Sequence, residues 1–531
     1  MSTQLDQAKK GDNDPGAFFE PEMLEAIALI YECDAPQYQR LRIELKQHIS
    51  ISALEKLIGQ FVGGKRDKPN PADELVNMVN VDIELFHDEN KIAYVSIDTG
   101  GHTETYPVYS RSTFEWLSMK FYKQTEKCAT DLTIKTAQNA LSGKARFDGE
   151  LIKPFLRVAN FEDSYILDLG NADWNAVKVN AEGWQIVHTP PVKFWRNENM
   201  TPLATPVRNG SLKKLWKLLN VRAKDRVFIL AFIFECWRND TMFPILELIG
   251  EQGTAKSSVQ TVLRTFIDPN LVPLRAAPKS TEDLFVSASQ NWLASYNNLS
   301  HLRADMQDAF CSLSTGGGIG VRKLYTNNEE SVIDVSRPCI MNGIGSIATA
   351  QDLLDRVIRI ELPKIKSNRP ASELDQFLED SKAEIFGALL SIFSRVLRKL
   401  PEARKKPIND RMADFVMLGE AVLLSFNKTE SFAEFYERKK TRAATQAIES
   451  SPAILALLKI LGRRGEFHGT YARLHQSMKY QDMITGLPKS AKGVADLLKR
   501  HAPALRRIGI TMIHHEQRKK DGFHVSIVRK E

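Results

Sequence analysis

The sequence predicts a multidomain protein with a central α/β unit, a helical and α+β region before it, and a small unit of helices and strands after it. Three observations lead to this prediction. The 531 residues exceed what one hydrophobic core usually supports. In the middle of the chain, an apolar strand pattern runs through a glycine-containing loop into a helix pattern. The end of the chain combines three helix patterns with a hairpin pattern.

The composition is that of a soluble globular protein, with 43% hydrophobic and 26% charged residues. A net charge of +7 permits a nucleic-acid partner but does not establish one. The five cysteines lie far apart, which argues against a zinc site or a disulfide framework. We recognise no signal peptide, and the longest apolar run, Val227–Trp237, is too short to cross a membrane. We therefore expect a cytoplasmic protein without a membrane partner.

The chain before the central unit divides into two regions. Residues 1–75 are expected to form a helical region that ends in a linker rich in glycine, proline and charge. Residues 76–210 are expected to form an α+β domain, because alternating apolar runs flank an Asp-Glu-Asn turn and more strand patterns follow. Histidines and aspartates in hairpin turns are usually structural, so we assign no chemistry to this domain.

The central unit, residues 211–400, carries the pattern of a phosphate-binding loop between the apolar strand Phe243–Gly250 and a helix. Backbone N–H groups of such a loop bind phosphates, the Lys256 ammonium would bind the β and γ phosphates of ATP, and the Ser257 hydroxyl would bind Mg²⁺. Ala255 stands where a second glycine is usual, and a chance glycine-rich turn is the alternative interpretation. The predicted nucleotide-binding residues are Gly250, Glu251, Gln252, Gly253, Thr254, Ala255, Lys256, Ser257 and Ser258.

Two asparagines occupy the place where such a site needs an acidic residue. The strand pattern of residues 292–296 ends in Asn297 and Asn298. The side-chain oxygen of Asn297 could accept a hydrogen bond from metal-bound water, so Asn297 and Ser257 are the predicted metal residues. Asparagine lacks the negative charge that favours the cation, and it cannot act as a general base. Hydrolysis is therefore the weakest part of the predicted chemistry.

Two further polar residues complete the predicted catalytic set. Asn342 ends another strand pattern, where its amide would lie beside the γ-phosphate. Arg356 precedes the next strand, and we interpret it as an arginine finger that acts on a neighbouring subunit's nucleotide. A surface salt bridge with Asp352 or Asp355 is the alternative for Arg356. The predicted catalytic residues are Lys256, Asn297, Asn298, Asn342 and Arg356.

Several motifs in this order resemble a known family. The set is similar to the helicase-type AAA+ ATPases of phages, satellites and integrative islands, near superfamily 3 and the MCM-like helicases of staphylococcal cassettes. The resemblance is close over roughly residues 211–400 and looser in the flanks. The motifs that carry it are GEQGTAKSS, DPNLVPLRAAPKSTEDL, YNNLSHL, LSTGGGIGVRKLYT, RPCIMNGI and LLDRVIRIELP.

This resemblance implies a ring, expected to be a hexamer, that binds ATP and Mg²⁺ between its subunits. Alanine is common in this group at the position of Ala255. Asparagine is typical at Asn298, whereas aspartate is usual at Asn297. The implied roles are Walker A for Lys256 and Ser257, Walker B for Asn297 and Asn298, sensor 1 for Asn342 and arginine finger for Arg356.

A loop between the Walker B and sensor 1 motifs is a predicted DNA contact. The resemblance places such loops at the central pore, where Arg322 and Lys323 would bind phosphates beside the glycine hinge 316–318. A surface loop with solvated charges is equally compatible with the sequence by itself. Arg411 fits a surface residue better than a sensor-2-like arginine.

Residues 401–450 are expected to form a helical linker or lid, and residues 451–531 a winged helix similar to the C-terminal units of phage primase-helicases. From Lys489 onward, eleven basic residues stand against four acidic ones, a local charge of +7 that suits binding to DNA phosphates. A solvated basic helix that contacts proteins is the alternative. The predicted DNA-binding residues of this unit are Lys499, Arg500, Arg506, Arg507, Arg518, Lys519 and Lys520.

We therefore expect an ATP-driven DNA helicase or replication initiator of a phage or mobile element, acting on single-stranded, forked or origin DNA. Residues 1–210 contain no recognisable zinc module or acidic primase motif, so a separate primase is an expected partner. One alternative is a nucleotide-dependent DNA-binding scaffold with weak or no hydrolysis because of Asn297. Another is an origin-binding or defence ATPase that does not translocate.

Overall fold

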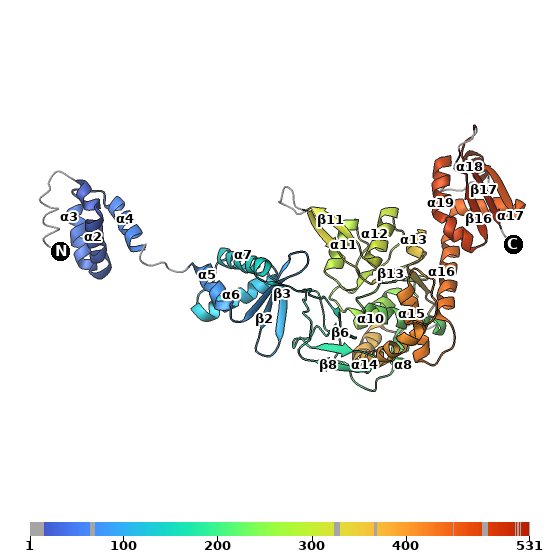
Figure 1. The fold of residues 1–531 in the computed structure, drawn as a ribbon, viewed down its shortest axis with the longest axis horizontal. Helices are drawn as coiled ribbons and strands as arrows, with labels where there is room; N and C mark the ends of the chain where they lie inside the picture. Colours follow the sequence, from blue (N-terminus) through green and yellow to red (C-terminus); the bar gives the residue numbers. More distant parts are fainter. Residues whose placement is uncertain are drawn as a thin grey trace. The chain divides into compact units, whose positions relative to one another are not determined.

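The computed structural model describes residues 15–63, 70–322, 330–365, 369–449, 451–480, 487–515, 517, 520 and 522–529. Contacts divide the chain into two compact units, which are Met1–Ile83 with Val108–Lys144, and Glu84–Pro107 with Ala145–Glu531. Figure 1 shows their helices and strands. None of the helices in the described part of the chain has the length and apolarity needed to cross a membrane.

The first unit is helical. Its first helices follow a short 3-10 helix, η1 (Pro15–Phe19), and their apolar faces form a small core around Ile27, Leu41 and Ile58. The Asp34 carboxylate accepts a hydrogen bond from the Gln37 N–H at 2.9 Å, which caps the second of these helices. The helices are α2 (Pro21–Cys33), α3 (Ala35–Leu45), α4 (Ile51–Gly63), α5 (Pro71–Val79), α6 (Arg111–Thr125) and most of α7 (Asp131–Phe147).

The region expected to form one α+β domain contains two separate sheets. The first has the order β3-β2-β1-β4, with β1 and β4 parallel and β2 and β3 antiparallel. The second has the order β5-β6-β7-β8 and is antiparallel. The strands are β1 (Ile83–His87), β2 (Ala93–Asp98), β3 (Thr103–Pro107), β4 (Glu150–Leu151), β5 (Val158–Phe161), β6 (Ser164–Asp168), β7 (Ala176–Val179) and β8 (Trp184–Val187).

The second of these sheets shares its hydrophobic core with the central unit. The Trp184 indole N–H donates to the Ser391 hydroxyl at 2.9 Å. Arg157 and Asp268 form a fully buried ion pair, with Nε and Oδ1 3.0 Å apart. Removing one partner of a buried pair leaves an uncompensated charge and costs about 3–5 kcal/mol of stability. This pair therefore fixes β5–β8 to the central unit.

The central sheet is parallel and has the strand order β10-β13-β9-β14. All five residues of β9 are buried, and their only charge, Glu247, is matched by Arg359 of β14 with Oε2 and Nε 2.5 Å apart. Because the strands are parallel, their carboxyl ends meet at one edge, where ligands bind in open α/β sheets. The strands are β9 (Ile245–Ile249), β10 (Ala294–Tyr296), β13 (Cys339–Gly343) and β14 (Val357–Glu361).

Helices and a hairpin surround the central sheet. The long apolar run noted in the sequence is the buried helix α9, and the segment before β13 forms an antiparallel hairpin of β11 and β12. The helices before β14 are α8 (Leu212–Leu218), η2 (Ala223–Asp225), α9 (Arg226–Cys236), α10 (Lys256–Ile267), α11 (Thr281–Ser289), α12 (Ala304–Thr315) and α13 (Gln351–Leu354). The hairpin and the helices after β14 are β11 (Gly318–Arg322), β12 (Glu330–Asp334), α14 (Ala371–Ala403), α15 (Ala413–Ser425) and α16 (Phe432–Glu449).

The C-terminal part folds around its own hydrophobic core. Its three strands form an antiparallel sheet of order β15-β17-β16, so a third strand joins the expected hairpin. The elements follow the order α17 (Pro452–Arg464), β15 (Glu466–Thr470), α18 (Tyr471–Lys479), α19 (Ala491–Arg507), β16 (Ile510–His514) and β17 (His524–Arg529).

Candidate nucleotide site

The loop between β9 and α10 has the backbone conformation of a tight, glycine-dependent turn. Gly250 has a φ of 156°, and a Cβ there would approach the Thr254 hydroxyl oxygen to 2.8 Å. Ala255 has a φ of 59°, in the left-handed region that glycine enters without steric penalty. The residue that departs from the usual loop pattern therefore adopts the conformation for which glycine is normally chosen, at a cost of roughly 1–2 kcal/mol.

The Lys256 side chain lies inside this loop. Its Nζ donates to the carbonyl oxygens of Gly250 and Glu251, both at 2.8 Å. Burial of the ammonium lowers the pKa of Lys256 from its ordinary value. Asn220, which the sequence gave no reason to select, joins the loop to the chain after β14, because its Nδ2 donates to Thr254 O at 3.1 Å and to Pro363 O at 2.7 Å.

Three predicted residues from different elements meet beside the loop. The Ser257 hydroxyl donates to Asn297 Oδ1 at 2.9 Å, and Asn342 Nδ2 donates to the same oxygen at 2.7 Å. The Asn298 N–H donates to Asn342 Oδ1 at 3.0 Å. The sheet order explains the meeting, because β10 and β13 are neighbours and both end at the edge where α10 begins.

Sequence reasoning missed Gln260, which lies beneath this cluster in α10 and is fully buried. Its Oε1 accepts from Asn342 Nδ2 at 2.5 Å, and its Nε2 donates to the Ser295 hydroxyl oxygen at 2.8 Å. Both amide hydrogens of Asn342 are thus engaged, one by Gln260 and one by Asn297. A γ-phosphate would have to displace one of these acceptors. The sequence contained one signal for Gln260, its spacing. Gln260 follows Ser257 by about one helical turn, so both side chains lie on the same face of the helix.

The side-chain oxygens of Ser257, Asn297 and Asn342 in this cluster are all uncharged. Of the residues that the structure describes, no aspartate or glutamate carboxylate forms a hydrogen bond or an ion pair with Lys256, Ser257 or Asn297. The described residues also hold no group of three or more histidine, cysteine, aspartate or glutamate side chains that could bind a metal. The predicted metal residues Ser257 and Asn297 are joined by the 2.9 Å hydrogen bond between Ser257 Oγ and Asn297 Oδ1.

Arg356 lies at the opposite edge of the sheet from the loop. The Ile245 N–H donates to Arg356 O at 2.9 Å, so Arg356 lies beside the first residue of β9. Five residues of strand separate this point from Gly250, about 16 Å at 3.3 Å per residue. Arg356 therefore cannot contact a nucleotide in its own loop, and its action on a neighbouring subunit stays a prediction.

The surface salt bridge considered for Arg356 is wrong, because the side chain is only 4% exposed. Its guanidinium donates to the carbonyl oxygen of Asp352, and its Nε has no hydrogen-bond partner in the described part of the chain. The carboxylates have other partners: Asp352 pairs with Arg411 at 2.8 Å and Asp355 with Arg507 at 3.0 Å. Arg411 is thus an exposed surface residue in an ion pair, as preferred from the sequence.

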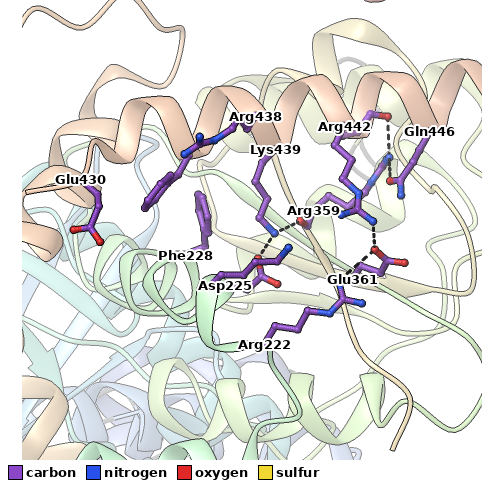
Figure 2. A pocket seen from close by; sticks show the side chains of 13 residues that line it. Arg222, Asp225, Phe228, Arg359, Glu361, Glu430, Arg438, Lys439, Arg442 and Gln446 are labelled. Atoms are coloured by element: carbon purple, nitrogen blue, oxygen red, sulfur yellow. Dashed lines mark hydrogen bonds and ion pairs between the residues drawn. The ribbon is translucent and has the colours of Figure 1, made fainter. Parts of the chain in front are cut away.

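A cavity of about 480 Å³ lies among residues of η2, α9, β14 and α16 (Figure 2). Glu361, at the end of β14, lines it and is in register with Ile249, the last residue of β9. Figure 2 shows Lys439 and Arg442 reaching from α16 toward Asp225 and Glu361. Further lining residues are Arg222, Lys224, Phe228, Arg359, Glu430, Phe435, Arg438, Ala443 and Gln446.

Helix α16 supplies three of the basic side chains that line the cavity. The Lys439 ammonium lies 2.5 Å from the Asp225 carboxylate and donates to Arg359 O at 3.1 Å, while burial lowers its pKa. The Arg442 guanidinium lies 2.6 Å from the Glu361 carboxylate. The Arg438 guanidinium lies over the Phe435 ring, 4.9 Å from its centroid. The basic run at residues 438–440 was the available sequence signal for this lining.

The predicted DNA-binding residues lie in three places. Arg322 ends β11, while Lys323, Arg518 and Lys519 lie outside the described residues. Lys499 and Arg506 are exposed on α19, which also contains Arg500, and Lys520 is exposed after β16. Arg507, the last residue of α19, is only 22% exposed because its guanidinium is bonded to Asp355.

Comparison with known proteins finds two family models that match parts of this chain. Residues 212–432 match the family model of the actinomycete integrative conjugative element replication protein, and residues 452–530 match the AICE RepA C-terminal domain. Over these ranges the chain is similar to replication proteins of mobile elements, so the resemblance predicted from the motifs is confirmed. No curated protein matches the chain.

Solved structures give weaker likenesses. One is the active helicase Cch of SCCmec type IV, at 11% identity and a TM-score of 0.43, covering 84% of this chain and 93% of that one. Another is the apo C-terminal region of NrS-1, at 13% identity and a TM-score of 0.39, covering 87% of this chain and all of that one.

Proposed function

We propose that this chain is an ATP-dependent replication protein of a mobile element that couples nucleotide turnover to DNA binding or unwinding. The observation that carries the proposal is the convergence of Lys256, Ser257, Asn297 and Asn342 at the carboxyl edge of a parallel sheet. The N-terminus of α10 and the loop N–H groups would bind the phosphates. Lys256 would exchange its two loop carbonyls for phosphate oxygens.

The residues present fit Mg²⁺ that is bound mainly by phosphate. Mg²⁺ usually keeps several waters and takes few protein ligands when substrate phosphates bind it. Ser257 Oγ and Asn297 Oδ1, 2.9 Å apart, would face such an ion. The ion would offset phosphate charge, and the chain would contribute its position but no negative charge.

We propose further that the cavity beneath α16 takes the nucleoside half of ATP. Its volume, about 480 Å³, lies within the usual 300–1,000 Å³ of small-molecule sites. Its lining residue Glu361 is in register with Ile249, the last residue of the strand that leads into the loop. Phe228 and Phe435 supply aromatic surface to it, and α16 supplies positive charge.

The test of the proposal is ATP turnover by the full chain with and without single-stranded and forked DNA. We expect DNA to raise turnover, and strand displacement on the fork would then identify a helicase rather than an initiator that does not translocate. ATP binding without turnover would instead favour the nucleotide-dependent scaffold, which the neutral Asn297 makes the second candidate. Absence of ATP binding would contradict both.

We also propose a ring in which Arg356 completes a neighbour's site, supported by its distance of about 16 Å from its own loop. Mixing two inactive variants tests this. Lys256→Ala subunits keep Arg356, and Arg356→Ala subunits keep Lys256, so a mixed ring is expected to contain some complete sites. Recovery of turnover on mixing, together with a nucleotide-dependent rise in molecular mass, is the expected result. A monomer, or no recovery, would contradict a shared site.

A further inference from the structure

Helix α16 lines the cavity with some of its residues and packs into the C-terminal core with others. Phe435, Lys439 and Arg442 of this helix line the cavity. Ala444 and Ile448 of its second half are buried in the hydrophobic core of the C-terminal part. One continuous helix therefore joins the proposed nucleotide site to the part with the predicted DNA-binding residues.

Arg507 adds a second, electrostatic connection. It ends α19, the helix that carries the exposed Lys499 and Arg506, yet its Nη2 donates to Asp355 Oδ1 at 3.0 Å. Its Nε lies 3.8 Å from Glu437 Oε1 of α16. Both partners of the Arg507–Asp355 pair are shielded, at 22% and 25% exposure, so water weakens the pair less than it would an open surface pair.

Asp355 is the residue directly before Arg356 and follows α13. Its Oδ1 also accepts from Nε2 of Gln351, the first residue of α13, at 2.8 Å. Arg356 is buried with an Nε that has no partner in the described part of the chain. A buried polar group without a partner is unfavourable, so this position needs support from neighbouring contacts. The Arg507–Asp355 pair supplies such a contact one residue away.

We propose that Arg507 is a positioning residue that holds α13, and with it Arg356, in the buried position until DNA binds. This rests on the proposed function. DNA phosphates that gather along α19 would compete with Asp355 for the Arg507 guanidinium, because phosphate and carboxylate both accept its paired N–H donors. Release of Asp355 frees α13, and Arg356 becomes available to a neighbouring subunit's nucleotide. DNA binding is thereby coupled to turnover.

The first measurement is hydrogen exchange of residues 351–356, α13 and the two residues after it, on the full chain without nucleotide. Arg507→Ala is expected to raise this exchange at least fivefold, and a DNA duplex is expected to raise it in the wild type but to add nothing in the variant. Arg506→Ala removes the same charge one residue earlier. It is expected to weaken DNA binding while α13 exchanges as in the wild type. Unchanged exchange in Arg507→Ala, or no response of the wild type to DNA, would overturn the proposal.

Asp355→Asn provides a second variant that breaks the pair from the other side. It should match Arg507→Ala in α13 exchange but bind DNA more tightly than the wild type, since Arg507 is kept and no longer has to be released from Asp355. Both variants are expected to show raised turnover without DNA and a smaller stimulation by DNA. If no protein turns over ATP, the proposed function fails, yet the exchange experiment still decides the Arg507 contact. Weak DNA binding by Arg507→Ala with normal exchange would make Arg507 a plain DNA contact.

Discussion

Lys256→Ala is expected to lower the affinity for ATP and to reduce turnover by about 100-fold or more. A loss of this size is usual when one hydrogen-bond donor that stabilises the negative charge of the transition state is removed. The Nζ of Lys256 lies 2.8 Å from two carbonyl oxygens of the loop, so the loop already directs the ammonium to where phosphates would bind. Alanine removes this charge and leaves the start of α10 intact, because alanine is a good helix former.

Isothermal titration with ATP and steady-state turnover would measure the two effects. Lys399→Ala is the matched control, because Lys399 is an exposed lysine paired with Glu402 in α14, away from the loop. This control is expected to bind and turn over ATP as the wild type does. Equal affinity in Lys256→Ala and the wild type would contradict the assignment of the loop.

Asn297→Asp is expected to raise turnover by roughly 10- to 100-fold and to lower the Mg²⁺ concentration needed for half-maximal rate. An opposite charge within a few ångströms is worth roughly 1–4 kcal/mol in a partly solvated site. The carboxylate would fit without rearrangement, because the two donors to Asn297 Oδ1, the Ser257 hydroxyl and the Asn342 amide, can both bond to an aspartate oxygen.

Turnover measured as a function of Mg²⁺ concentration tests this prediction. Asn297→Leu serves as the counterpart, since it removes the acceptor and leaves both donors unpaired, and it is expected to be less active than the wild type. A gain in the aspartate variant from an inactive wild type would identify the natural chain as a nucleotide-dependent scaffold. No change in either the rate or the Mg²⁺ requirement would show that the metal does not bind at Asn297.

The strand, turn and helix around the predicted phosphate loop could be predicted from the sequence because they are contiguous, and the structure has them as β9, the loop and α10. The strand, the glycines, the lysine and the hydroxyl lie within one short stretch, and local geometry positions them. The asparagines could also be predicted, because polar residues at the ends of parallel strands meet at one edge. The structure adds the hydrogen bonds between these residues: Asn297 Oδ1 accepts from the Ser257 hydroxyl and from the Asn342 amide.

Other features depend on residues far apart in the chain. Gln260, Asn220 and the cavity lining of α16 act through contacts that no local pattern encodes. Arg507 is the clearest case, because Arg506 directly before it is basic and exposed, whereas tertiary packing gives Arg507 a partner in Asp355, 152 positions away. A count of charges in the sequence gives every arginine of a helix the same weight. Only the fold shows which of these arginines is paired with a carboxylate.

By itself, therefore, the sequence determined where a phosphate-binding loop is predicted, which residues follow the strands beside it, and that its replication-protein resemblance lies in the central and C-terminal parts. The tertiary structure decided that Ala255 takes the left-handed conformation, that Arg356 is buried at the far edge of the sheet, and that α16 links the cavity to the C-terminal core. The physical reason is the sequence separation of the interacting residues. Local backbone conformation follows from short segments, whereas burial and ion pairing depend on which distant segments pack together.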